Sequence, residues 1–325
     1  MVNMIRPIQF VLLGVVTSIL FLNACTGSLP SASIKGPSTY RQDMDLVTGG
    51  FQRDYRVHIP SGYDGSIQLP LVVVIHGAFD TAKGMERFSG FSDLADREQF
   101  IVLYPEGIGI LGFLQHWNAG HCCGKAAEDQ IDDVTYLKKA IDDVCMRLAV
   151  DRRRVYMTGF SNGGMMTYRF AAEHSDMLAA VAPIAASIGG RPTADAPQWC
   201  IPAPQKPLPI LIVHGMDDDD IPFEGGRSRA RKGERTFISV HDSAQFWIEA
   251  NGCKGSPALS GLYHGAVEVQ RWDHCMNACA TVLCKVKKWG HRWPGPYFTA
   301  QLPDDDPLLD FDIAEMIWSF FKQFP

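Results

Sequence analysis

The segment RVYMTGFSNGGM, residues 154–165, decides the fold. Its middle, residues 159–163, has the pattern G-x-S-x-G, with a strand-like run before it and a helical pattern over 163–174 after it. A sharp turn between a strand and a helix holds a serine hydroxyl clear of the sheet, and the glycines leave room for that turn. The segment therefore predicts that Ser161 is a nucleophile. The alternative is that Ser161 only caps the helix.

Short apolar runs and helical patterns alternate along the rest of the chain. Parallel strands need crossover helices, so this alternation predicts an α/β fold with a mostly parallel central sheet and helices on both faces. No repeat or long linker interrupts residues 46–325, and we expect a single domain there. The strand-like runs are 55–59, 71–75, 100–104, 154–158, 178–184 and 210–213, and the helical patterns are 84–98, 132–148, 163–174, 237–251 and 308–321.

A serine hydroxyl is a weak nucleophile and needs a base, which a carboxylate orients. With this strand–turn–helix motif, the acid and then the histidine follow the serine in the chain. His291 lies late, in WGHRWPG, where glycine and proline mark a rigid loop after a strand-like run, so we expect it to be the general base. The acid is expected among Asp217 to Asp220, and spacing does not choose between them. A calcium site is the other interpretation of four adjacent acids.

The tetrahedral intermediate of acyl transfer needs preorganised N–H donors. We expect one from the backbone of Asn162 and one from Ala78 or Phe79, which follow the strand at 71–75. Two loops, 108–130 and 185–209, also leave strand ends, where binding sites of α/β sheets form. Trp117 and Asn118 in the first loop are therefore candidates for the wall of a substrate pocket. The alternative is that both loops are surface loops tied by disulfides.

Composition limits the classes of partner. The chain has 325 residues, 46% of them apolar, with 30 basic and 36 acidic side chains and a net charge of −6. This excludes a disordered chain, and a mildly acidic protein makes nucleic acid an unlikely partner class, so we expect none. No cofactor or metal site is predicted. The segment 226–235 carries five basic residues, which indicates either a solvated loop or a rim that meets acidic glycan or lipid headgroups.

The first 24 residues have the features of a secretory signal: one base, a short apolar run and small residues at the end. The end resembles the lipobox of bacterial lipoproteins, which implies that Cys25 is lipidated and that the chain is exported, either to the outer membrane or cell surface or to the medium. A single anchor helix is the alternative. Residues 25–45 are rich in Ser, Thr, Gly and Pro and are expected to form a flexible tether, so that the lipid is the only contact with the membrane.

Export also bears on the cysteines, because an even set in an oxidising compartment favours disulfides. Eight remain besides Cys25, and eight allow 105 pairings, so the sequence leaves the pairing open. The rival interpretation is a zinc site from His274, Cys275, Cys279 and Cys284, although their spacing matches no usual zinc pattern. The eight are Cys122, Cys123, Cys145, Cys200, Cys253, Cys275, Cys279 and Cys284.

Taken together, these features resemble the family of secreted polyhydroxybutyrate depolymerase-like and feruloyl esterase-like enzymes, carbohydrate esterase family 1. The resemblance covers about residues 46–320, and its motifs are specific as a set. They are His76-Gly77, Trp117-Asn118 with Cys122-Cys123-Gly124, Asp132-Asp133-Val134, GFSNGGM at 159–165, His214-Gly215-Met216 with Ile221-Pro222-Phe223, and Gly290-His291 with Trp293-Pro294-Gly295.

The resemblance implies an α/β-hydrolase fold and a serine esterase. In the family the acid stands three residues after the His-Gly pair and four before the proline, which here is Asp218, with Asp217 and Asp220 as rivals. It also implies Trp293 in the substrate pocket and a Cys253–Cys275 disulfide. The expected substrates are feruloyl or acetyl esters of plant polysaccharide, or polyhydroxyalkanoate esters. A glycan-binding lipoprotein on an inactive scaffold and a serine peptidase of the same fold are the alternatives.

Overall fold

A ten-stranded sheet forms the centre of the molecule, in the order β1-β2-β4-β3-β7-β8-β11-β16-β15-β14. The computed structural model describes residues 36–110, 113–230 and 232–325, which belong to one compact unit. The six strands from β4 to β16 run parallel, and antiparallel pairs close both edges. The predicted mostly parallel sheet is thus confirmed, with antiparallel edges that the sequence pattern did not indicate.

The strands of this sheet agree closely with the apolar runs. Continuous β-branched runs fit strands that are buried on both faces, as the all-buried β3 shows. The bounds are β1 Ser38–Thr48, β2 Phe51–Ile59, β3 Leu69–Ile75, β4 Ile101–Pro105, β7 Val150–Phe160, β8 Ala180–Ile184, β11 Ile210–Gly215, β14 Ala258–Leu262, β15 Val267–Trp272 and β16 Thr281–Val286. The strands β1, β14 and β15 were missed because they show no apolar run: β14 is exposed, and most residues of β1 and β15 are only half-buried or exposed.

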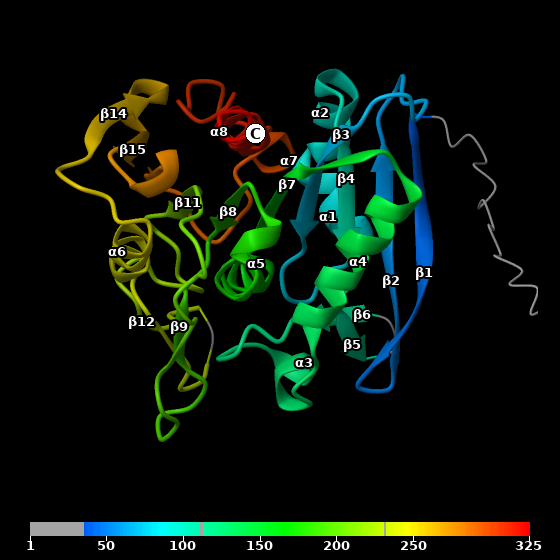
Figure 1. Cartoon of the computed structure of the whole chain (residues 1–325). Helices are drawn as coiled ribbons and strands as arrows, with labels where there is room; N and C mark the ends of the chain where they lie inside the picture. Colours follow the sequence, from blue (N-terminus) through cyan, green and yellow to red (C-terminus); the bar gives the residue numbers. More distant parts are fainter. Residues whose placement is uncertain (1–35, 111–112, 231) are drawn as a thin grey trace, which may run out of the picture. The chain divides into compact units, whose positions relative to one another are not determined.

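Helices cover both faces of the sheet (Figure 1). Alternate residues of β3 enter two separate cores: Leu71, Val73 and Ile75 pack with α4, α5 and α6, whereas Val72 and Val74 pack with α1, α2 and α8. This two-sided packing is the one expected for a buried parallel strand. The bounds are α1 Ala82–Ser89, α2 Phe91–Glu98, α3 Gly124–Glu128, α4 Asp133–Arg147, α5 Asn162–Glu173, α6 Val240–Ala250, α7 Pro296–Thr299 and α8 Ile313–Phe321.

One predicted helix and one predicted tether differ from the structure. The pattern over 84–98 is two helices, because Gly90 adopts a left-handed conformation at φ 76° that ends α1. Residues 38–45, expected in the tether, are part of β1, whose backbone pairs with β2. These residues were not recognised as a strand because their side chains are mostly polar, and an edge strand needs few apolar residues. The signal at 1–24 and Cys25 lie outside the described residues.

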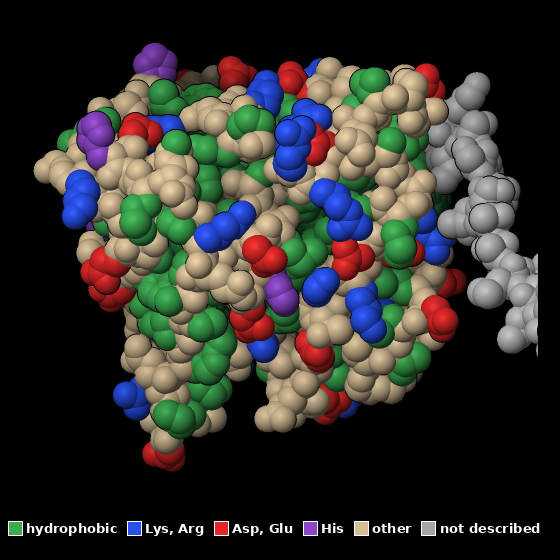
Figure 2. All heavy atoms as spheres, viewed as in Figure 1, with side chains coloured by type: hydrophobic (Ala, Val, Ile, Leu, Met, Phe, Trp, Pro, Cys, Tyr) green, Lys and Arg blue, Asp and Glu red, His purple; other side chains and the backbone are tan. Residues whose placement is uncertain are grey.

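Smaller elements gather beyond the carboxyl ends of the parallel strands. They include a four-stranded sheet in the order β10-β9-β13-β12 and the hairpin β5–β6. Figure 2 shows a hollow at the lower edge of the surface, between the part around β9 and β12 and the part around α3. In the described residues, no helix combines the length and apolar character needed to cross a bilayer. The bounds are β5 Ile108–Ile110, β6 Phe113–His116, β9 Gly189–Arg191, β10 Trp199–Cys200, β12 Gly226–Arg227 and β13 Thr236–Phe237.

Candidate active site

Ser161 sits on the turn between β7 and α5, as the sequence motif predicts. Its backbone has φ 55° and ψ −121°, a conformation that non-glycine residues rarely adopt, and its N–H donates to the Ile184 carbonyl at 2.9 Å. The neighbouring Gly159 and Gly163 leave no space for a Cβ, because each would collide with backbone carbonyl atoms. The glycines are therefore required by close contacts between the turn, α5 and β3, and the turn presents the hydroxyl to a cavity.

The imidazole of His291 lies between Ser161 and Asp218. His291 Nε2 is 2.8 Å from Ser161 Oγ, and Nδ1 is 2.7 Å from Asp218 Oδ2. The three residues follow β7, β11 and β16, which are close neighbours in the sheet and end at the same edge. An ionised Asp218 fixes the tautomer: Nδ1–H donates to the carboxylate, and Nε2 is left to accept the serine proton.

Asp218 is the member of the acidic run that points inward. Its side chain is fully buried, whereas Asp217 and Asp219 are exposed. Its Oδ1 accepts from the backbone N–H of Asp220 at 2.9 Å and of Ile221 at 2.8 Å. Burial opposes ionisation, but the hydrogen bonds from His214 and His291 outweigh it and hold the pKa of Asp218 below its ordinary value. The carboxylate is therefore charged and has a fixed direction.

Of the three proposed N–H donors, two belong to residues that line the cavity and have no other acceptor in the described residues. In the described part of the chain, neither Ala78 nor Asn162 has a hydrogen bond from its backbone N–H, and both line the cavity beside Ser161. The N–H of Phe79 is already donated to the Gln115 carbonyl at 2.8 Å. The choice between Ala78 and Phe79 therefore narrows to Ala78.

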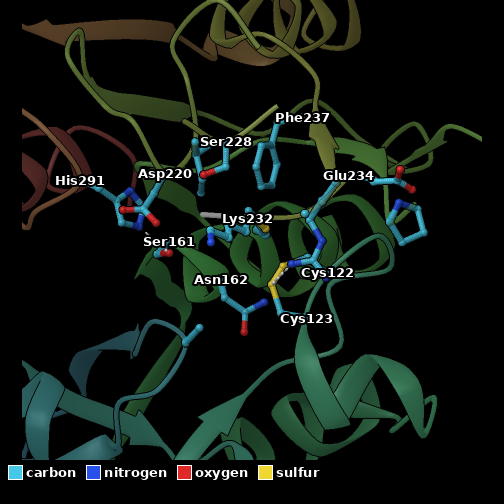
Figure 3. Close-up of a pocket in the computed structure, with 16 residues that line it drawn as sticks. Cys122, Cys123, Ser161, Asn162, Asp220, Ser228, Lys232, Glu234, Phe237 and His291 are labelled. Carbon is cyan, nitrogen blue, oxygen red and sulfur yellow. Dashed lines mark hydrogen bonds between the residues drawn. A yellow bond between two sulfur atoms is a disulfide. The ribbon is translucent and has the colours of Figure 1, made fainter. Parts of the chain in front are cut away.

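The cavity at Ser161 has a volume of about 220 Å³. In Figure 3, Ser161 and His291 lie at one end, with Asp220 and Ser228 nearby, and Cys122 and Cys123 lie at the other. Met165 and Phe237 add apolar side chains to the lining of the same cavity. Lys232, Glu234 and Arg235, from the segment between β12 and β13, also line the cavity. The cavity therefore offers an acyl group apolar contacts, and charged side chains form another part of its wall.

Trp117, Asn118 and Trp293, which we expected in the pocket wall, do not line this cavity. Both tryptophans are fully buried, because their rings have better partners inside the fold. Trp117 packs against His76 and Tyr136, and Trp293 packs against Phe160 and Phe91. A tryptophan beside a strand end looks like a pocket wall in the sequence, and only its contacts show otherwise. The sequence reasoning instead missed Met165 and Phe237.

Beneath the loop of Ala78 lies a buried polar cluster. His76 donates from Nδ1 to the Gly77 carbonyl at 2.7 Å and accepts at Nε2 from the Gly107 N–H at 3.0 Å. Burial lowers the pKa of His76 to about 4, so the ring is neutral. Burial likewise raises the pKa of Glu106, which accepts from the Ala82 N–H, to about 7. The hydrogen bonds of His76 and Glu106 thus hold the loop of Ala78, and burial favours the neutral form of both side chains.

The basic segment folds against the acidic run. Arg229 Nε lies 2.6 Å from Asp219 Oδ1, and the N–H groups of Arg229 and Ala230 donate to the Asp219 carbonyl. Both paired side chains stay more than half exposed, and salt screens such pairs strongly. The segment is a rim of the cavity, and its surface position leaves both sequence interpretations of its charge open.

Two disulfides are present among the described cysteines. Cys253 is bonded to Cys275, the pair that the family resemblance implied, and Cys122 is bonded to Cys123. The even count suggested full pairing, but four cysteines stay free: Cys145, Cys200, Cys279 and Cys284. Because Cys275 is in a disulfide, the rival zinc set is not assembled.

Comparisons with known proteins agree with this architecture. Residues 53–194 match the family model described as esterase PHB depolymerase. The chain is 30% identical to feruloyl esterase B of Piromyces equi over 82% of its own length, but it spans only 44% of that protein. It is 29% identical to the putative esterase NocK of Nocardia uniformis subsp. tsuyamanensis, covering 82% of this chain and 81% of the relative.

A solved structure shows the same fold. A CE1 ferulic acid esterase from Anaeromyces mucronatus aligns with 90% of this chain and 92% of its own, with a TM-score of 0.53 and 13% identity. At this identity the likeness concerns the fold alone. The chain therefore has an α/β-hydrolase fold, within which residues 53–194 match the esterase PHB depolymerase model.

Proposed function

We propose that this chain hydrolyses carboxylic esters through an acyl-enzyme on Ser161. The observation that carries the proposal is the continuous chain of hydrogen bonds from Ser161 through His291 to Asp218 at the mouth of a cavity. Ala78 and Asn162, whose backbone N–H groups have no other acceptor in the described residues, line the same cavity as the serine. A nucleophile, a base, an oriented carboxylate and a pair of N–H donors are the parts that acyl transfer needs.

In the first half of the reaction, Ser161 Oγ attacks the ester carbonyl carbon while His291 Nε2 takes the hydroxyl proton. The carbonyl oxygen becomes an oxyanion that accepts from the N–H groups of Asn162 and Ala78. Asp218 stabilises the imidazolium that forms, because its buried carboxylate already accepts from Nδ1. The tetrahedral intermediate then expels the alcohol, which receives the proton from Nε2, and the acyl group stays on Ser161.

In the second half, His291 Nε2 takes a proton from water as the water oxygen attacks the acyl carbon. The same N–H pair stabilises the second oxyanion, and the intermediate collapses to release the carboxylic acid. The proton on Nε2 returns to Ser161 Oγ, which restores the starting state. Because acylation and deacylation use the same two N–H donors, one arrangement of these donors lowers the barrier of both steps.

The relatives narrow the class of substrate. The family model is described as esterase PHB depolymerase, and relatives are named feruloyl esterase and acetylxylan esterase. We therefore propose feruloyl or acetyl esters of plant polysaccharide, or polyhydroxyalkanoate, as substrates. The apolar side chains in the cavity lining, among them Met165 and Phe237, suit an acyl chain of any of these. We further propose that residues 1–24 direct export and that Cys25 carries a lipid, which would bring the enzyme to ester polymers outside the cell.

The test is turnover of methyl ferulate, acetylated xylan and polyhydroxybutyrate by the wild type and by Ser161→Ala. We expect Ser161→Ala to lose about 10⁶-fold in kcat, since removing such a nucleophile leaves only binding and oxyanion stabilisation. A serine-directed phosphonate should add one adduct mass to the wild type and none to the variant. Ser243→Ala is the matched control, because Ser243 is buried in α6 away from the cavity. Near-wild-type turnover by Ser161→Ala would refute the proposal.

A further inference from the structure

The segment Gln115–Trp117 lies between the two N–H donors proposed for the oxyanion. One donor, Ala78, follows β3, and the other, Asn162, begins α5. These two donors belong to separate elements, and no hydrogen bond between them holds their spacing in the described residues. Residues 115–117 bond to both elements, so their contacts decide where the two N–H groups point.

On the α5 side, the contact is a pair of hydrogen bonds between the Asn162 side chain and the backbone N–H and carbonyl of Trp117. Asn162 Oδ1 accepts from the Trp117 N–H at 2.7 Å, and Asn162 Nδ2 donates to the Trp117 carbonyl at 3.0 Å. Both residues are almost completely buried. Two bonds to one planar amide fix its orientation as well as its distance, and in a buried place they exchange with no water.

On the β3 side, two further bonds enclose the peptide of Ala78. The Trp117 indole Nε1–H donates to the His76 carbonyl at 2.9 Å, and the Phe79 N–H donates to the Gln115 carbonyl at 2.8 Å. One bond therefore lies before Ala78 in the chain and the other directly after it. With both flanks held, the Ala78 peptide has little freedom to turn, so its N–H keeps one direction.

The indole itself is held from its other side. Its ring stacks on Tyr136 at 6.2 Å between centroids and 15° between planes, and the Arg53 guanidinium lies 3.6 Å from the Tyr136 ring centre. Arg53 pairs with the buried Asp133 at 2.8 Å. The indole therefore cannot turn its N–H away from His76 without breaking this packing.

We propose that Trp117 and the side chain of Asn162 are positioning residues that fix the spacing of the two oxyanion donors. An oxyanion needs both N–H groups at about 2.7–3.1 Å from one point, and a shift of about 1 Å can cost 100-fold in rate. The inference rests on the proposed esterase function, because it assigns to the Trp117 and Asn162 side chains the task of holding the two N–H donors in place.

The first test compares Trp117→Phe with Trp247→Phe. Both remove an indole N–H from a buried ring, but Trp247 Nε1 has no partner in the described residues and Trp247 does not line the cavity. We expect Trp117→Phe to lower kcat by about 10- to 100-fold with KM nearly unchanged, since the donors act mainly on the transition state. Trp247→Phe should keep the wild-type kcat. Circular dichroism and thermal melting report whether each variant is folded.

The second test uses Asn162→Ala with Asn251→Ala as its control. Asn251 makes the same two-bond contact, to the backbone of Leu208 at 2.8 and 2.9 Å, in the core rather than at the cavity. Both variants should lose similar stability, but only Asn162→Ala should lose kcat, although its backbone N–H remains. The double variant Trp117→Phe/Asn162→Ala should lose less than the product of the two single effects, because both act on one spacing.

The deciding readout is the affinity for an alkyl trifluoromethyl ketone, whose adduct with Ser161 carries an oxyanion. Its affinity should fall by the same factor as kcat/KM in Trp117→Phe and in Asn162→Ala. The proposal is overturned if kcat falls while this affinity is unchanged, if only KM changes, or if the variants match their controls. A wild type that turns over no ester overturns the proposed function instead, so the two failures are distinct.

Discussion

The floor and the roof of the cavity are built in opposite ways. The floor, defined as Ala78, Ser161, Asn162 and His291, stands on the carboxyl ends of parallel strands and on short hydrogen bonds between buried groups. The roof, defined as Ser228 and residues 232–235, comes from the segment between β12 and β13. Of its charged side chains, Lys232 and Glu234 are exposed and Arg235 is half-buried.

The difference separates two tasks. Reaction geometry must be held to a fraction of an ångström, and only buried, fully bonded groups on rigid elements achieve this. Selection among substrates needs chemical variety at the rim, and exposed loops supply it at little cost in stability. Substitutions in and beneath the floor should therefore have large effects, and equivalent substitutions near the roof should have small ones.

The largest contrast is expected between Asp218→Asn and Asp219→Asn. The first replaces the buried partner of His291, and an amide there favours the wrong tautomer, so kcat should fall by about 10³- to 10⁴-fold. The second changes an exposed carboxylate that pairs with Arg229 in the basic segment, and kcat should stay within a few-fold. Steady-state hydrolysis of p-nitrophenyl acetate measures both. A loss of less than 10-fold in Asp218→Asn would contradict the contrast.

The same contrast should appear in stability. Asp133→Asn leaves the buried Arg53 without its counter-charge and should lower the free energy of unfolding by about 3–5 kcal/mol. Asp219→Asn removes only an exposed ion pair and should cost less than about 1 kcal/mol. Urea unfolding followed by fluorescence measures both values. Equal losses would mean that the buried pair contributes no more than the exposed one.

The smallest effect concerns pH. Burial raises the pKa of Glu106 from 4.5 to about 7, so the folded chain keeps a proton that the unfolded chain releases. The resulting stability is full below about pH 4.5 and is lost as pH rises through 7. Glu106→Gln has no carboxyl group at this position and stays neutral at every pH. As the pH rises from 4.5 to 7.5, its free energy of unfolding should therefore increase by up to about 3 kcal/mol relative to that of the wild type. Parallel pH curves for the two proteins would exclude this account.

The sequence indicated the floor far better than the roof. Ser161 was predicted because the flanking glycines have one strict steric purpose, and His291 because its loop has few alternatives late in the chain. The choice of Asp218 depended on the family resemblance, because the sequence alone does not show which of the four adjacent acids is buried. The parallel strands were found because burial on both faces imposes apolar runs.

Other features depend on contacts that no local pattern records. Trp117 was placed in the pocket wall, whereas its indole donates inward to the His76 carbonyl. Phe79 was a candidate donor until its N–H was found on Gln115. Met165 and Phe237, which line the cavity, look in the sequence like ordinary core residues. These outcomes are set by which groups meet across the fold, and a single sequence carries no such distances.

The order of the strands along the chain determines when the three residues of the proposed triad can come together during folding. The serine, carboxylate and imidazole follow β7, β11 and β16, and β16 is the last strand made. If Ser161 acts as proposed, a growing chain holds this serine early but has no partner for it until β16 has docked. We therefore expect ester hydrolysis to appear only with complete folding, and an N-terminal fragment that lacks β16 to cleave no ester by the proposed route.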